Sequence, residues 1–372
     1  MAILKVINNT VFKALPKQST ELDTTQKADV PKDKFFGVES AELKRGHYLV
    51  ELTQEISPVG KSGYFFAGHV QIEDIDINVP SKIVRVHKNG RNWFASVDSG
   101  SEFFVGKDVP YDGNRGLQNI ADNSAAQYQA SDYRDRYGFW ADFIVPTAKC
   151  ESNSYFNCLN TYDRAFFTFG FLQYAAHVPN GDFVKFFSKL LETPFGKGYF
   201  PDLFVQNGQI FRETMSGNTP LTDNNSTEKL MVYLNPTVAQ IEEKEVIQAA
   251  KFIHWTIYSQ QHRDIQVQCG IEHFKEAMKR YARWYPLDGV PDKVCLVIAD
   301  IHHQGRAKRS VVYEALDTNG NYEEAFNNLL EIGQQSYTER LRTLSREIQQ
   351  SIRDGILGRR VYDTINNNFE LD

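Results

Sequence analysis

The stretch Pro146–His177, PTAKCESNSYFNCLNTYDRAFFTFGFLQYAAH, carries the densest set of chemically capable side chains in the sequence. Glu151 follows a segment with a helical pattern, Tyr133–Ile144, and Asp163 comes twelve residues after Glu151. Ala165–Phe171, a run of small and aromatic residues, predicts an extended segment. The stretch therefore predicts a helix with a carboxyl at its end, followed by a hairpin that carries a second carboxyl.

This arrangement suits the hydrolysis of a glycosidic bond. One carboxylic acid must protonate the leaving oxygen, and a second polar group must hold water or stabilise the oxocarbenium-like centre. Glu151 and Asp163 are the candidate carboxyls, and Thr168 and Gln173 supply a hydroxyl and an amide nearby. The pattern favours a glycoside hydrolase among enzymes.

Composition indicates a globular protein. The chain has 372 residues, of which 41% are hydrophobic and 24% charged, enough for two or three domains. The formal net charge of −6 argues against a nucleic-acid partner, which normally meets a basic face. Four cysteines are too few for a disulfide scaffold, and the sequence holds no apolar run long enough for a membrane span.

Turn signals and periodicity divide the chain into three parts. Residues 1–78 show short apolar runs separated by Gly and Pro, which predicts a small β domain. Residues 79–123 hold one Asn-Gly hairpin signal, at Asn89, and then VPYDGNRGLQNIADN, which we interpret as a connector. Residues 124–372 are mostly helical in pattern. The face of Phe183, Phe186, Phe187, Leu190 and Leu191 is one example.

The order of Glu151, Asn160–Asp163 and Phe167–Gln173 resembles the lysozyme-like superfamily, in particular its goose-type lysozyme and chitosanase branches. In those proteins a catalytic Glu ends a helix and precedes an acidic residue and a Thr/Ser-x-Gly element. The later Asp300–Arg306, DIHHQGR, resembles a buried helix end in bacterial proteins that share the first motif and mostly act on peptidoglycan. The resemblance covers about residues 124–362. It departs from the chitosanase pattern because Asp163-Arg164-Ala165 stands in place of Asp-Gly-Arg-Gly.

The resemblance implies an α+β fold class. Val6–Ile72 is similar to the bacterial Src-homology-3-like repeats that accompany cell-wall enzymes. We therefore expect a small N-terminal SH3-like β-barrel, followed by a mainly α lysozyme-like catalytic domain.

The resemblance also implies the roles of the site residues. Glu151 would be the general acid, Asp163 the base or stabiliser, and Thr168 would help to position the attacking water. No metal and no cofactor are expected. Further residues that we expect to line the substrate cleft are Tyr133, Tyr162, Gln173, His254, Asp300, His302 and Gln304.

Each of these residues also has a simpler interpretation. Glu151 could solvate a loop, and Asp163 could pair with Arg164 or form an Asx-turn. Thr168 could be an ordinary strand residue. Because His302 and His303 are adjacent on a helix, their side chains point about 100° apart and make poor joint metal ligands. His254 could be a core residue.

Two further alternatives concern the cysteines and a turn. Cys150 and Cys158 could form a disulfide or be two buried thiols, and Cys150 with His177 could form a nucleophilic pair. Asp317–Glu323, DTNGNYE, has oxygen ligands at alternate positions but departs from the calcium loop of an EF-hand.

The sequence thus predicts a muramidase that cleaves the β-1,4 glycan of peptidoglycan. The alternatives are a chitosanase-like hydrolase of other amino-sugar polymers and a non-catalytic module that binds the cell wall. The first residues, MAILKVINNTVFKALPKQ, lack the pattern of a conventional signal peptide. We therefore expect synthesis in the cytoplasm and delivery to the periplasm by a specialised secretion apparatus or a phage. An antibacterial effector of this kind would have an immunity protein as a partner.

Overall fold

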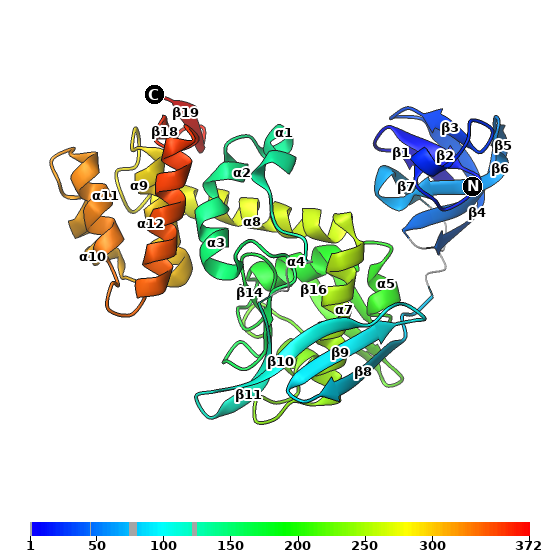
Figure 1. The fold of residues 1–372 in the computed structure, drawn as a ribbon, viewed down its shortest axis with the longest axis horizontal. Helices are drawn as coiled ribbons and strands as arrows, with labels where there is room; N and C mark the ends of the chain where they lie inside the picture. The colour runs from blue at the N-terminus through cyan, green and yellow to red at the C-terminus, as the bar shows by residue number, and fades with distance from the viewer. Residues whose placement is uncertain (1, 45, 74–79, 121–124) are drawn as a thin grey trace.

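The structure is a computed structural model of the chain and describes residues 2–44, 46–73, 80–120 and 125–372 (Figure 1). Within these residues the chain forms two seven-stranded antiparallel sheets, two small sheets and a set of helices. Two separate hydrophobic cores lie beneath them, one within residues 2–70 and one within residues 95–369. The half-buried ring of Phe195 packs against both cores.

The first sheet has the strand order β3-β2-β6-β5-β4-β1-β7. In β5, one of its two longest strands, buried positions alternate with partly buried ones, and Tyr48, Val50 and Leu52 turn to the core. The strands, drawn in blue in Figure 1, are β1 (Ala2–Val6), β2 (Thr10–Lys13), β3 (Lys27–Val30), β4 (Phe35–Lys44), β5 (His47–Ile56), β6 (Gly60–Phe66) and β7 (Val70–Glu73).

The second sheet has the order β14-β13-β12-β11-β10-β9-β8. The Asn-Gly signal at Asn89 is confirmed as a hairpin, because Asn89 pairs with Asn92. The three short strands within Pro146–His177 extend this sheet beyond β11. Its strands are β8 (Val84–Asn89), β9 (Asn92–Val97), β10 (Phe103–Tyr111), β11 (Asn114–Asn119), β12 (Leu159–Asn160), β13 (Thr168–Phe169) and β14 (Tyr174–Ala175).

The expected fold class, an SH3-like barrel followed by a mainly α lysozyme-like domain, is wrong. The first sheet is not closed within the described residues, because its edge strands β3 and β7 do not pair with each other. A second large sheet follows it, and the chain is about 36% helix and 28% strand. The expected boundaries at residues 78 and 123 fall outside the described residues.

The physical reason for this error is a turn that the sequence analysis interpreted as part of a connector. Asp112 and Gly113 both have positive φ, 46° and 79°, as a two-residue hairpin turn with the twist of the flanking strands requires. Tyr111 pairs with Asn114 across this turn, so β10 and β11 form a long hairpin. The polar residues of the segment hid its strands because one face of the hairpin is open to solvent.

Helices pack on the second sheet and around the central α8 (Figure 1). α7 packs against β8, β9 and β10, and α12 packs against α3. The helices of four turns or more are α7 (Glu243–Tyr258), α8 (Gln260–Tyr281) and α12 (Thr338–Arg353). The shorter ones are α1 (Arg134–Tyr137), α2 (Trp140–Phe143), α3 (Val145–Ser152), α4 (Asp182–Leu191), α5 (Gly196–Tyr199), α6 (Glu228–Leu234), α9 (Asp292–Gln304), α10 (Arg309–Leu316) and α11 (Tyr322–Glu331).

Two small sheets complete the fold. β15 (Leu203–Gln206), β16 (Gln209–Thr214) and β17 (Gly217–Pro220) form one, and β18 (Arg360–Asp363) and β19 (Asn368–Leu371) form the other. Across the described ranges, no helix has both the length and the hydropathy that crossing a membrane requires.

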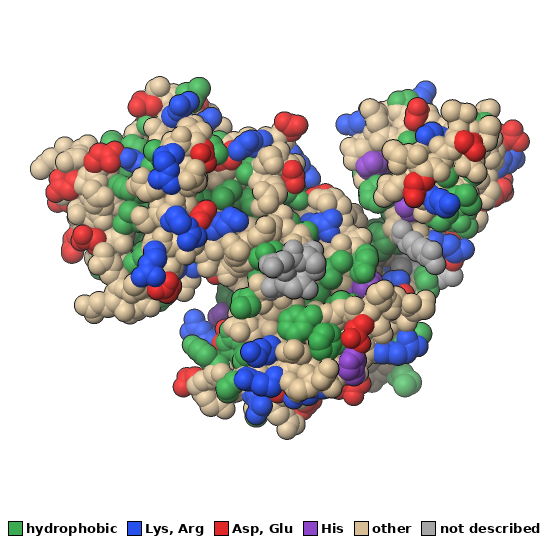
Figure 2. Space-filling model, in the orientation of Figure 1, with side chains coloured by type: hydrophobic (Ala, Val, Ile, Leu, Met, Phe, Trp, Pro, Cys, Tyr) green, Lys and Arg blue, Asp and Glu red, His purple; other side chains and the backbone are tan. Residues whose placement is uncertain are grey.

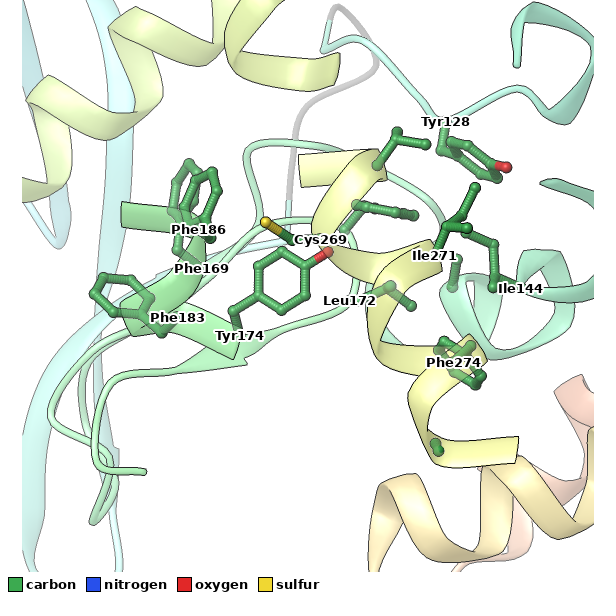
Figure 3. Close-up of a cluster of buried hydrophobic side chains, with 14 of the residues drawn as sticks. Tyr128, Ile144, Phe169, Leu172, Tyr174, Phe183, Phe186, Cys269, Ile271 and Phe274 are labelled. Atoms are coloured by element: carbon green, nitrogen blue, oxygen red, sulfur yellow. The ribbon is translucent and has the colours of Figure 1, made fainter. Parts of the chain in front are cut away.

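An aromatic core joins α4, α7, α8 and the end of the second sheet. Figure 3 shows Phe169, Phe183 and Phe186 on one side of Tyr174, and Ile271 and Phe274 of α8 on the other. The Tyr174 hydroxyl donates to the carbonyl of Gln266 at 2.7 Å, which ties β14 to α8. The predicted apolar face of α4 is confirmed, because its Phe and Leu side chains are buried.

Phe252 lies at the centre of this core, with ring centroids 5.0–5.3 Å from those of Phe167, Phe169, Phe187 and Phe200. We expect Phe252→Ala to lower the free energy of unfolding by about 3–5 kcal/mol, because it removes a buried ring and leaves a cavity. Urea denaturation measures the change. Phe35→Ala is the matched control, since Phe35 is 57% exposed. Equal stability of the two variants would contradict this core.

Candidate active site

Glu151 lies on the last turn of α3. Pro146 opens this helix at its first turn, where its missing N–H costs nothing, and Asn153 ends it in the left-handed conformation with φ 51°. The Ser152 hydroxyl donates to the carbonyl of Phe171 at 2.7 Å. This hydrogen bond joins the end of α3 to the turn between β13 and β14. It therefore fixes the position of the helix relative to the hairpin, next to Glu151.

The carboxyl of Glu151 meets two cationic or ionisable side chains. Its Oε1 lies 2.7 Å from Nη1 of Arg340 on α12 and 3.5 Å from Nε2 of His303 on α9. The side chain is 13% exposed. Side chains from α9 and α12 therefore orient the Glu151 carboxyl.

Arg340 is itself held by a buried carboxylate. Its guanidinium contacts Asp300 Oδ1 at 2.7 Å, and Arg306 contacts Asp300 Oδ2 at 2.9 Å. The Thr147 hydroxyl donates to the same carboxylate at 3.2 Å. Asp300 is fully buried, so each of these contacts acts where water screens little.

The close packing of these groups shifts the pKa values of Asp300 and Arg340. Burial alone would raise the pKa of Asp300, but Arg340 and Arg306 hold it below its ordinary value. Burial opposes the charge on Arg340, yet Glu151 and Asp300 outweigh it and raise the pKa of Arg340. Arg340 is therefore a permanent cation beside Glu151.

His303, on α9, contacts the same oxygen of the Glu151 carboxyl as Arg340 does. Its ring stacks on Phe274 at 5.5 Å between centroids, and burial lowers its pKa against the opposing effect of Glu151. His273 lies 5.5 Å away, ring to ring, and pairs with Asp182 at 2.8 Å. A line of ionisable groups thus runs from α4 through α8 and α9 to Glu151.

Asp163 lies in the loop between β12 and β13. Its Oδ1 accepts from the backbone N–H of Ala165 at 2.9 Å, which is the local turn that the sequence analysis kept as an alternative. No hydrogen bond or ion pair joins Asp163 to Glu151 within the described part of the chain. Burial and Arg164 lower the pKa of the nearby His177, against the opposing effect of Asp163.

Thr168, Gln173 and Tyr162 lie at the same end of the second sheet. Thr168 on β13 is 5% exposed and sits directly across from Asn160. Gln173 donates to the carbonyl of Gly170 at 2.8 Å and accepts from Asn160. The Tyr162 hydroxyl accepts from Gln118 at 3.2 Å, so this end carries a run of amide and hydroxyl groups.

The remaining candidates lie in three places. Tyr133 donates to Asp264 of α8 at 3.0 Å. His254 shares a hydrogen bond with Tyr199, and His302 shares one with Tyr285. Burial lowers the pKa of both histidines to about 4, so both are neutral near pH 7. Gln304 is half-buried at the end of α9.

Of the predicted residues, the structure brings Glu151 and Asp300 together, through Arg340. Sequence reasoning missed Arg340 because no local motif marks a partner so far along the chain. One signal was present. Arg340, Leu344 and Ile348 follow one another at four-residue spacing, so the arginine stands on the apolar stripe of α12. A charge on such a stripe indicates a buried partner.

The disulfide and the nucleophilic pair lose support, whereas the alternative of two unpaired, largely buried thiols agrees with the structure. All four cysteines are unpaired, and Cys150 donates to the carbonyl of Arg340 at 3.6 Å. Burial raises the pKa of the Cys150 and Cys158 thiols to about 12, which disfavours the thiolate that a nucleophile needs. Within the described ranges, no three His, Cys, Asp or Glu side chains are grouped as a metal site.

Comparison with known proteins returned no match: no family model, no curated protein and no solved structure is similar to this chain. The roles of the site residues therefore rest on chemistry and geometry.

A second buried acid supports the loop that carries Asp163. Glu245 of α7 is fully buried and accepts a hydrogen bond from the Thr161 hydroxyl, while its Oε2 has no partner. Asn235 donates to the carbonyls of Thr161 and Phe166 at 2.9 and 3.0 Å. Hydrogen bonds with Glu245 and Asn235 thus hold both ends of the loop that carries Asp163. Burial raises the pKa of Glu245 to about 8.

This pKa makes stability depend on pH. Glu245 keeps its proton in the folded chain up to about pH 8, whereas the unfolded chain loses it near the ordinary value of 4.5. The protonated Glu245 contributes fully to the free energy of unfolding below about pH 4.5. This contribution is lost as the pH rises towards 8, with a slope approaching ~1.4 kcal/mol per pH unit. We expect Glu245→Gln to remove this slope in urea denaturation at a series of pH values. Parallel profiles for wild type and variant would contradict a buried neutral acid.

Proposed function

We propose that the protein hydrolyses the β-1,4 glycan of peptidoglycan, with Glu151 as the general acid. The observation that carries this proposal is the geometry of the Glu151 carboxyl. Arg340 and His303 both contact Oε1, which orients the carboxyl at the end of α3. Glycosidic cleavage requires a positioned carboxyl that can donate a proton to the leaving oxygen.

The cation beside Glu151 favours an acidic polymer. Arg340 is a permanent charge at the site, and α12 carries four arginines and two glutamates. Within our proposal, the arginines of α12 contact the carboxylates on the lactyl-peptide arms of peptidoglycan.

The second role in our proposal belongs to Asp163, with Thr168 as its helper in directing water. Asp163 keeps Oδ2 free of any described partner, while Oδ1 is fixed by the backbone of Ala165. A carboxylate held by one oxygen is oriented enough to accept a proton from water. Within this proposal the enzyme acts in the cell wall after delivery, as an antibacterial effector or a phage-related lysin.

One observation favours a second candidate function. The ion pair of Glu151 with Arg340 is also what a purely structural carboxylate would form. The protein would then be a non-catalytic module that binds the cell wall.

Loss of turbidity of purified sacculi separates these functions. We expect Glu151→Gln to lower the lysis rate by ~100-fold or more, because the amide cannot donate the required proton. Glu192→Gln is the matched control, since Glu192 is an exposed carboxyl at the end of α4. Thermal melting shows whether each variant is folded. Lysis by folded Glu151→Gln at the wild-type rate would exclude Glu151 as the acid, and binding without lysis by wild type would favour the second candidate.

A further inference from the structure

A cavity of about 530 Å³ lies between the segment of α1 and α2, the helix α8 and the hairpin of β18 and β19. Its lining includes Lys275 of α8, Arg360 of β18 and Asn368 of β19. None of the described residues that contact the Glu151 carboxyl belongs to this lining. The cavity is therefore separate from the candidate active site.

Hydrogen bonds hold the walls of this cavity together. The Asn367 side chain donates to the carbonyl of Lys275 at 3.3 Å, which joins the β18–β19 hairpin to α8. The indole N–H of Trp140 donates to Oδ1 of Asn368 at 3.0 Å, which joins the same hairpin to α2. The three elements around the cavity are thus positioned by the fold itself, before any ligand binds.

The amide of Asn368 is oriented as a hydrogen-bond donor. The indole nitrogen of Trp140 can only donate, so its bond fixes which end of the Asn368 amide is the oxygen. The amide nitrogen of Asn368 makes no hydrogen bond with any described residue, and the residue is exposed. Its N–H groups are therefore open to a ligand that accepts hydrogen bonds.

Lys275 and Arg360 bring two positive charges to the same lining. Lys275 Nζ lies over the Trp140 ring at 5.7 Å from its centroid, and the Arg360 guanidinium lies over Phe139 at 4.6 Å. Arg360 also donates to the carbonyl of Ile356 at 3.4 Å. Neither cation forms an ion pair with a described residue. A ring face orients a cation, but it leaves N–H groups for an anion.

The carboxylates of the neighbouring elements are engaged elsewhere, and none of those described belongs to the lining. On α8, Glu272 pairs with Lys189 at 2.8 Å. Glu276 pairs with Lys185 at 3.3 Å. Asp363 of β18 accepts from the backbone of its own turn. Acidic and basic side chains lie intermixed over most of the face that Figure 2 shows, so a lining with cations alone is a local exception.

We propose that this cavity binds the oxyanion group, a carboxylate or a phosphate, of a small ligand. Lys275 supplies a compact charge, Arg360 a planar fork of N–H donors and Asn368 a neutral donor, and an oxyanion accepts from all three. A cavity of a few hundred Å³ has room for a small molecule around that group. The inference does not depend on the proposed function, because it uses no residue of the candidate active site.

Thermal melting of the full chain in inorganic phosphate or in citrate tests this inference, with potassium chloride at equal ionic strength as the reference. A ligand that binds the folded chain raises its melting temperature. We expect at least one of the two anions to raise it above the reference, and the one that does so identifies the group as phosphate or carboxylate. Because both anions also stabilise proteins by exclusion from their surfaces, the comparison of variants decides.

Asn368→Asp is the sharpest variant. Its carboxylate still accepts from Trp140, so the fold is kept, but it removes the N–H donors and repels an anion. We expect this variant to lose the part of the temperature shift that exceeds its own general stabilisation. We expect Lys275→Gln to raise the anion concentration for half of the shift by about tenfold.

Lys279→Gln is the matched control. Lys279 is an exposed lysine of the same helix outside the lining, and its loss changes the net charge equally. This control should respond to the anions as the wild type does. Equal shifts in wild type and Asn368→Asp, or equal weakening in Lys275→Gln and Lys279→Gln, would overturn the inference.

Discussion

The contact of Arg340 with two carboxylates is the interaction on which the candidate site depends. Arg340 reaches from α12 to Asp300 on α9 and to Glu151 on α3, so three helices distant in sequence meet at one guanidinium. Removing one partner from such a buried group is costly, because the remaining charge has lost both water and its counter-ion. The network therefore fixes Glu151 only when all three helices are packed.

The second sheet also positions the candidate site. Its short strands β12, β13 and β14 follow α3 directly and are tied to it through the Ser152 hydroxyl. The same sheet continues through β11, β10 and β9 to β8. One continuous sheet thus extends from the short strands beside the end of α3 to the edge strand β8.

Local patterns in the sequence predicted local structure well. The hairpin at Asn89 and the apolar face of α4 follow from two-residue turn chemistry and helical spacing, and both are present. The β10–β11 hairpin was missed because its half-exposed strands carry polar residues, although Asp112-Gly113 was a valid turn signal. Arg340 could not be found as the partner of Glu151, since an ion pair between distant segments exists only once the helices are packed.

Mass spectrometry of the fragments released from purified sacculi by the wild-type protein tests the central claim most directly. Glycan hydrolysis at Glu151 predicts soluble fragments with new reducing sugar ends and intact peptide stems. Fragments with new amino termini and an intact glycan, or no released fragments from a folded protein, would contradict it.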